Sequence, residues 1–271
     1  MGLTGGGLGA PLEAAWAVRD GTLRADTRCY DNPVQRKKNP AGISTFAKIR
    51  GEDYYYVDKT RLALRLIDQG SYYFLSRPHR FGKSLFLDTL AELFQANRPL
   101  FRGLYAEPHW NWGIEYPVVR FSFGGGMLRD RHDLEAKFNE LLDINQVALG
   151  VACQQRTAQG CFAELIRLAA DRHGQRVVVL VDEYDKPILD NLTRPDIARE
   201  LRDGLRNLYS VIKDNDAHIR FVFITGVSKF SKVSLFSGLN NLEDITIAPE
   251  LEGLDRQQIK SWYNGPGRRG R

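Results

Sequence analysis

The chain has 271 residues, of which 43% are hydrophobic and 26% are charged, which is typical of a globular protein. These proportions exclude collagen-like, coiled-coil and fully disordered proteins, and no apolar run approaches the roughly 20 residues that span a bilayer. The first residues contain neither a secretory signal nor, with glycine at position 6, a myristoylation site. Cys29, Cys153 and Cys161 form no CxxC pair, which favours a reducing compartment. We therefore expect a cytoplasmic protein without a membrane segment.

The net charge of +5 comes from the two ends of the chain. Residues 1–40 carry six basic and four acidic side chains, and residues 265–271 carry three arginines. Residues 41–264 contain 29 basic and 29 acidic side chains. A nucleic-acid-binding domain usually carries its basic excess on the folded body. The charge therefore gives little support to direct binding of DNA or RNA.

Hydrophobic periodicity divides the chain into an extension and a folded body. Residues 1–40 are rich in glycine near the start and lack a sustained period, so we expect them to be poorly ordered. Residues 54–57 form a β-prone run, and a helix that begins near Asp58 or Thr60 should end at Gly70. Further patterns predict strands at 72–75, 118–123, 177–181 and 220–225, and helices at 84–95, 131–149, 162–172 and 197–213. This alternation indicates an α/β fold with a mainly parallel sheet and helices on both faces.

A basic loop follows the strand at 72–75 and reads Arg77-Pro78-His79-Arg80-Phe81-Gly82-Lys83-Ser84. Its end matches the phosphate-binding pattern GxxxxGK[ST], with Arg77 in place of the first glycine. Backbone N–H groups of such a turn and of the following helix bind phosphate oxygens. Lys83 would reach the β and γ phosphates, and the Ser84 hydroxyl would ligate Mg²⁺. The alternative is a simple turn with a capping serine, but the strand before and the amphipathic helix after favour the phosphate site.

The buried strand at 177–181 is followed by two acidic residues, Asp182 and Glu183. If this strand lies beside the phosphate loop in the sheet, Asp182 would face the Mg²⁺ shell. Glu183 would then polarise the attacking water as a general base. The alternative is that both acids cap the next helix. The presence of the loop at 77–84 favours the catalytic pair.

These motifs, together with several others, resemble the bacterial AAA-ATPase-like family of P-loop NTPases. The resemblance runs in order through roughly residues 41–265 and is carried by Ile43-Ser44-Thr45-Phe46, Tyr55-Tyr56-Val57-Asp58-Lys59-Thr60, Arg77-Pro78-His79-Arg80-Phe81-Gly82-Lys83-Ser84-Leu85, Asp182-Glu183-Tyr184-Asp185-Lys186-Pro187, Phe223-Ile224-Thr225-Gly226-Val227-Ser228-Lys229-Phe230 and Trp262-Tyr263-Asn264-Gly265. It implies a P-loop NTPase three-layer sandwich, ATP as the nucleotide, and arginine as the usual replacement for the first Walker glycine. It also implies an extra strand between the two motif strands, which 118–123 would supply. Thr225 would sense the γ-phosphate, or could equally close a strand end by bonding its backbone.

Members of that family usually continue into a region that resembles a PD-(D/E)XK nuclease. The chain stops after Gly265 and a Pro-Gly-Arg tail, so we expect a truncated end. Its one [DE]xK triplet, Glu135-Ala136-Lys137, lies in a helical stretch without an upstream Pro-Asp, and we expect no nuclease site. The domains expected are an extension at 1–40, an ATPase-like domain at 41–265 and a basic tail at 266–271.

The candidate site residues fall into three groups. Nucleotide contacts are expected from Arg77, Arg80, Phe81, Gly82, Lys83, Ser84 and Leu85, metal ligation from Ser84 and Asp182, and catalysis from Glu183, Lys83 and Thr225. The basic side chains of the loop could all face the triphosphate, or Arg77 and Arg80 could be held by acids such as Asp185 or Asp190; we favour ligand contact by Arg80. The tyrosines at 54–56 could stack on a base, although packing is the favoured interpretation.

The sequence thus predicts a Mg²⁺-dependent ATPase. The alternative is a nucleotide-gated interaction module with little hydrolysis, acting with a nuclease-like or other protein partner or with a second copy of the chain. Nucleic acid would be engaged only indirectly, through such a partner. The preference for ATP over GTP comes from the family resemblance alone.

Overall fold

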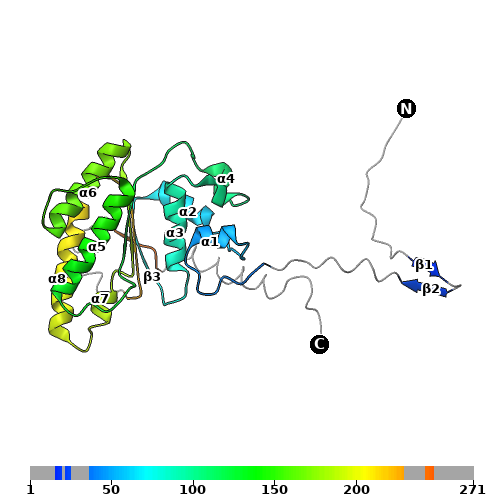
Figure 1. Cartoon of the computed structure of the whole chain (residues 1–271), viewed down its shortest axis with the longest axis horizontal. Coiled ribbons are helices and arrows are strands. Elements are labelled where there is room, and N and C mark those ends of the chain that lie inside the picture. Colours follow the sequence, from blue (N-terminus) through cyan, green and yellow to red (C-terminus); the bar gives the residue numbers. More distant parts are fainter. Residues whose placement is uncertain (1–15, 20–21, 26–36, 229–241, 247–271) are drawn as a thin grey trace. The chain divides into compact units, whose positions relative to one another are not determined.

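The computed structural model describes residues 16–19, 22–25, 37–228 and 242–246. The chain divides into two compact units, residues 1–38 and residues 39–271. In the first unit, β1 (Trp16–Arg19) and β2 (Thr22–Ala25) form an antiparallel hairpin (Figure 1). The sequence did not predict it, because residues 1–40 lack a sustained period of two. The segment 262–265 and the tail 266–271 lie outside the described residues.

The described part of the second unit is built on a five-stranded parallel sheet with the order β4-β5-β6-β3-β7. The strands are β3 (Tyr72–Ser76), β4 (Val118–Ser122), β5 (Val177–Asp182), β6 (Ile219–Gly226) and β7 (Glu243–Asp244). Each of the four predicted strands is present within one or two residues of its expected bounds. The parallel sheet of the predicted α/β fold is therefore confirmed.

Helices cover both faces of this sheet and complete the predicted three layers (Figure 1). One face packs against α5 (Arg131–Leu149), α6 (Ala158–His173) and α8 (Pro195–Asp214). The other packs against α1 (Phe46–Gly51), α2 (Thr60–Gln69), α3 (Lys83–Phe94), α4 (Ala106–His109) and the 3-10 helix η2 (Arg98–Phe101). Two short helices, α7 (Lys186–Leu189) and η3 (Asp216–His218), lie in connections. Among the described helices, none combines the length and the apolar character that a bilayer crossing requires.

The alternation of side chains along the strands supplies the two halves of the core. In β3, Phe74 belongs to the cluster under α5, α6 and α8, whereas Tyr73 and Leu75 belong to the cluster under α2 and α3. Successive strand residues point to opposite faces, so a single apolar run contributes side chains to the core on both faces of the sheet. This explains why the strands at the centre of the sheet consist almost entirely of apolar residues.

One expectation about the order of the strands was wrong. The strand between β3 and β5 is β6, and β4 lies on the far side of β5. The burial patterns give the reason: β4 exposes Arg120 and Ser122 and suits an edge, whereas nearly every residue of β6 is buried. The β-prone run at 54–57 does not form a strand of the sheet. Instead, the Tyr56 ring packs edge-on against Phe46.

The outer edge of β4 is closed by a side chain from α5. The Asn145 amide oxygen accepts a hydrogen bond from the Arg120 backbone N–H at 2.8 Å, and its amide nitrogen donates to the Arg120 carbonyl at 2.9 Å. Asn145 is buried, and its amide nitrogen also donates to the Leu141 carbonyl. One side chain thus satisfies both outward-facing backbone groups of Arg120.

The end of β6 leaves no space for a side chain at Gly226. A Cβ atom there would lie 2.2 Å from a ring carbon of Tyr184, which is fully buried. We expect Gly226→Ala to lower the free energy of unfolding by about 1–3 kcal/mol, the usual cost of overpacking a core. Chemical denaturation would measure the loss. The control is Gly51→Ala, because a Cβ at Gly51 would meet no atom within 4 Å; equal stability of the two variants would contradict the expectation.

Candidate functional site

The parallel register brings the two sequence motifs to the same edge of the sheet. The loop 77–82 leaves the carboxyl end of β3, and the acidic pair follows the carboxyl end of β5. Between them, Gly226 ends β6 in register with Ser76. Residues that are far apart in the sequence therefore meet where P-loop proteins and other parallel α/β folds bind ligands.

The loop contains two residues in the left-handed region of backbone conformation. Gly82 has φ of +74° and Arg80 has φ of +68°. For a residue other than glycine this conformation costs about 1–2 kcal/mol, and such strain is concentrated at functional sites. The Gly82 carbonyl accepts the Phe86 N–H at 2.9 Å, so α3 begins directly after the loop. The first N–H groups of α3 have no acceptor within the helix, which is the arrangement that binds anions.

Lys83 folds back over the loop from the first position of α3. Its ammonium group donates to the carbonyls of Arg77 at 2.8 Å and Pro78 at 3.0 Å. Only 6% of the residue is exposed, and this burial lowers the pKa of the ammonium group. The negative charges of Asp182, Glu183 and Asp185 oppose that shift. The lysine and the three carboxylates therefore interact electrostatically at this edge of the sheet.

Asp182 is the last residue of β5 and is nearly buried. One of its carboxylate oxygens accepts a hydrogen bond from the Thr225 hydroxyl at 2.5 Å. Thr225 is fully buried on the neighbouring strand β6. Its hydroxyl is therefore committed to orienting Asp182, a role that neither of the sequence interpretations of Thr225 included.

Glu183 has φ of +53°, so the chain turns sharply directly after β5. Its carboxylate lies beside Gly124, where a Cβ atom would come within 3.0 Å of Oε2. The same residue lines a pocket with Lys83 and Ser84. The left-handed turn thus places the second acid over the phosphate loop, whereas Asp182 stays at the strand end.

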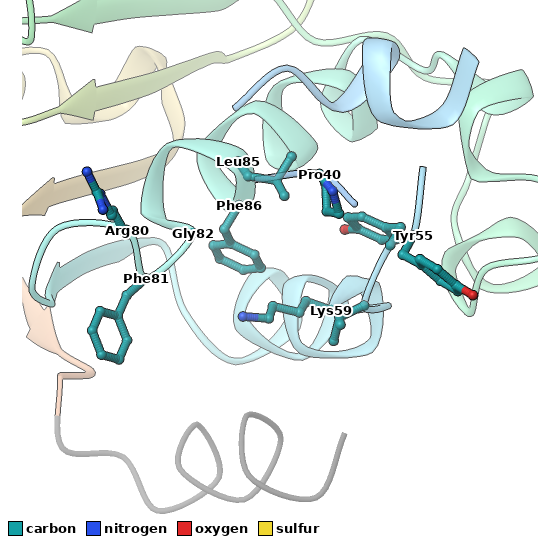
Figure 2. A pocket seen from close by; sticks show the side chains of 10 residues that line it. Pro40, Tyr55, Lys59, Arg80, Phe81, Gly82, Leu85 and Phe86 are labelled. Carbon is teal, nitrogen blue, oxygen red and sulfur yellow. The ribbon is translucent and has the colours of Figure 1, made fainter. Parts of the chain in front are cut away.

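Two adjoining pockets surround the loop. The larger has a volume of about 710 Å³; besides a segment at 39–44, its lining consists of His79, Arg80, Gly82, Lys83, Ser84, Leu85 and Glu183. The smaller has a volume of about 340 Å³ and is lined by Pro40, Tyr55, Tyr56, Val57, Lys59, Arg80, Phe81, Gly82, Leu85 and Phe86 (Figure 2). The two pockets share Pro40, Arg80, Gly82 and Leu85. Lys83 and Glu183 line only the larger pocket, whereas the tyrosine and phenylalanine side chains line only the smaller one, together with Lys59.

The cations of the loop are not held by the acids that the sequence suggested. Both carboxylate oxygens of Asp185 accept backbone N–H groups of Val227, and one also accepts that of Ser228. Asp190 pairs with Lys186. Figure 2 shows the Arg80 side chain and the Phe81 ring leaving the loop in different directions. Within the described residues, neither Arg77 nor Arg80 has a side-chain ion pair.

Most of the predicted site residues meet in these pockets. Arg80, Gly82, Lys83, Ser84, Leu85 and Glu183 line the larger one, and Phe81 lines the smaller one. Arg77, Asp182 and Thr225 line neither pocket; Asp182 and Thr225 are buried at the strand ends. Sequence reasoning missed the wall at 39–44 and the buried Asp185. Both occur in or next to motifs of the family resemblance, but no chemistry could be assigned to them without a structure.

Comparisons with known proteins identify a relative and a family. A protein from Azotobacter chroococcum mcd 1, described as "Uncharacterized protein in vnfD 5'region", is 65% identical over 252 residues. The match covers 86% of this chain and 49% of that protein, so the chain spans about half the length of this relative. Among solved structures, a chain in the structure of Drosophila ORC bound to GC-rich DNA and Cdc6 matches with a TM-score of 0.36 and 10% identity, over 76% of this chain and 62% of that one. The family model described as "Predicted AAA-ATPase" matches residues 40–236. The chain therefore belongs to the predicted AAA-ATPase family and is a P-loop ATPase-like module.

Proposed function

We propose that the chain binds ATP with Mg²⁺ and hydrolyses it. The observation that carries the proposal is the convergence of Lys83 and Glu183 on one pocket of about 710 Å³, although they lie 100 residues apart in the sequence. A cation that neutralises phosphate charge and a carboxylate that takes a proton from water are the two groups that phosphoryl transfer to water requires. The alternative that both acids merely cap a helix does not account for the position of Glu183 in this pocket.

The phosphate loop would bind the triphosphate through backbone N–H groups and Lys83. The Lys83 ammonium group donates to two loop carbonyls. Phosphate oxygens are stronger acceptors because they are charged, so the ammonium group would exchange these carbonyls for the β and γ phosphates. Arg80, which lines both pockets, would add a second positive charge near the polyphosphate.

The oxygens of Ser84 and Asp182 suit Mg²⁺. This ion takes oxygen ligands and usually keeps several waters, so one or two protein oxygens and the phosphates are enough to hold it. Asp182 fits this role because Thr225 fixes its carboxylate at the strand end. When bound, Mg²⁺ would neutralise charge that develops on the phosphate oxygens. Among the described residues, one other cluster of possible metal ligands exists, at Asp130, His132 and Asp133 on the surface, and we assign no function to it.

Glu183 would act in the chemical step. Its carboxylate would accept a proton from the attacking water while the water oxygen bonds to the γ-phosphorus and the bond between that phosphorus and the β–γ bridging oxygen breaks. The products are ADP and inorganic phosphate. Such a general base typically contributes 10²–10⁴-fold to the rate.

The smaller pocket would receive the base of the nucleotide. Phe81 is 53% exposed, which is unusual for so large an apolar side chain, and it lies on the loop that joins the two pockets. Phe86, in contrast, is buried against Phe223 and belongs to the core. A base that enters this pocket would cover Phe81 and gain stacking area. ATP rather than GTP remains part of the proposal, supported by the family.

We expect Glu183→Gln to lower ATP turnover by at least about 100-fold with little change in ATP affinity, because the amide cannot accept the proton. Lys83→Ala should remove both turnover and binding. Phosphate release and equilibrium nucleotide binding would measure these effects. Matched controls are Glu140→Gln and Lys137→Ala, an exposed ion pair on α5, which should leave both quantities unchanged.

Three outcomes would decide the matter. Full turnover in Glu183→Gln would remove the assigned general base. ATP binding without turnover in the unaltered chain, abolished by Lys83→Ala, would favour a nucleotide-gated module that changes its affinity for a partner. Absence of both binding and turnover would contradict the proposed function.

The two pockets can be tested separately with ATP and inorganic triphosphate. Phe81→Ala should weaken ATP binding by about 5- to 100-fold, since stacking on an aromatic ring is worth ~1–3 kcal/mol, and should leave triphosphate binding unchanged. Arg80→Ala should weaken the binding of both by about tenfold at fixed salt, because it removes a charge-assisted contact. Tyr105→Ala is the control, since Tyr105 is an exposed aromatic residue that lines neither pocket. Equal losses for both ligands in Phe81→Ala would refute the assignment of the base.

A further inference from the structure

Residues 226–228, here called the bridging segment, connect the phosphate loop with the acidic pair. They begin with the last residue of β6, which lies between the strands of the two motifs. The segment has one set of hydrogen bonds toward β3 and the phosphate loop and another toward the turn after β5. Both motifs therefore contact the same three residues.

The contacts toward β3 fix the start of the phosphate loop. The Arg77 N–H donates to the Gly226 carbonyl at 3.1 Å. The Ser76 hydroxyl donates to the Val227 carbonyl at 2.9 Å. Since Lys83 in turn donates to the Arg77 carbonyl, the position of the bridging segment determines where the lysine is anchored.

The contacts toward β5 centre on Asp185. Its two carboxylate oxygens accept the Val227 N–H at 3.1 and 3.2 Å, and one of them accepts the Ser228 N–H at 2.6 Å. Tyr184 adds two bonds: its backbone N–H donates to the Thr225 carbonyl at 3.0 Å, and its hydroxyl donates to the Ser228 carbonyl at 2.8 Å. Asp185 is completely buried. A carboxylate is stable in such a place only when hydrogen bonds replace its water, and here backbone N–H groups do so.

Val227 is thus held from opposite sides, by Asp185 at its N–H and by Ser76 at its carbonyl. We infer that Asp185 is a positioning residue that fixes the phosphate loop relative to Asp182 and Glu183 through the bridging segment. Its consequence for turnover rests on the proposed function, whereas the mechanical coupling does not. Asp185 lines neither pocket; its negative charge acts on Lys83, and its hydrogen bonds act through the peptide groups of residues 226–228.

The replacement Asp185→Asn tests this inference because it keeps the size of the side chain. An amide has one acceptor oxygen, and its NH₂ group would face N–H donors, so it cannot reproduce the three bonds. We expect kcat to fall by about 10- to 100-fold, since a misplacement of about 1 Å has an effect of this size, while the Kd for ATP changes less than about threefold. Asp190→Asn, the same change five residues further on at a partly exposed ion pair, should alter neither value.

Hydrogen exchange of the full chain gives a readout that needs no nucleotide. In Asp185→Asn, the amide of Arg77 should exchange at least about tenfold faster although Asp185 does not touch it, and the peptide 131–149 of α5 should exchange as before. Faster exchange confined to residues 227–228 would overturn the inference, because Asp185 would then act only locally. If Asp185→Asn unfolds, Ser76→Ala provides the second variant, and it should speed exchange at Val227 and Ser228.

The double variant completes the test. If both side chains act through Val227, Ser76→Ala combined with Asp185→Asn should lower kcat no further than the more severe single variant, whereas independent effects would multiply. Multiplied effects would count against the inference. Coupled exchange in a chain that neither binds nor hydrolyses ATP would keep the positioning role and reject the proposed function. Normal turnover without coupled exchange would support the proposed function and reject the positioning role of Asp185.

Discussion

The parallel alignment of β3, β6 and β5 is the constraint on which the site depends. Because all three strands run in one direction, their polar ends lie at one level, with Ser76 opposite Gly226 and the end of β5 one strand away. If β6 were antiparallel, its amino-terminal end would lie at this edge of the sheet. Thr225 would then be too far from Asp182 to form their hydrogen bond. The helix layers stabilise this arrangement from both faces. Neither residue of the acidic pair belongs to a helix.

The same edge of the sheet also contains several buried ionisable side chains. Lys83, Asp182 and Asp185 are all buried or nearly so, yet each has a specific partner: loop carbonyls for the lysine, a hydroxyl for Asp182 and backbone N–H groups for Asp185. Isolated charges in such places would cost several kcal/mol each. The polar ends of the strands supply the donors and acceptors that these buried groups require.

The sequence was sufficient for the parts of the fold that depend on local pattern. The helix at 131–149 could be predicted to the residue because Asp130 caps its start through the Asp133 N–H and Gly150 ends it in a left-handed conformation. The phosphate loop and the acidic pair could be found because their chemistry restricts the residue types. Strand order could not be found in this way, since adjacency depends on tertiary packing and the apolar strands β3, β5 and β6 have similar patterns.

The same limit applies within the site. Thr225 was recognised as a polar residue at a strand end, but the identity of its partner depends on β6 lying next to β5. Asp185 stood in a recognisable motif, yet its partners are backbone groups of Val227 and Ser228, which carry no signal in the sequence. The tyrosines at 54–56 were expected to pack rather than to bind a base; Tyr56 forms a hydrogen bond with Thr89, packs on Phe46 and, with Tyr55, lines a pocket.

The edge of β4 shows how the sheet is protected from self-association. An outer strand presents unpaired backbone groups to which the strand of another molecule can add. Asn145 bonds with both groups of Arg120 as a neighbouring strand would, and the bulk of α5 lies behind it. An incoming strand would have to displace a buried amide before it could extend the sheet past this residue. Within the described strands the ladder therefore ends at β4, and at Arg120 an added strand would find both backbone groups already paired with Asn145.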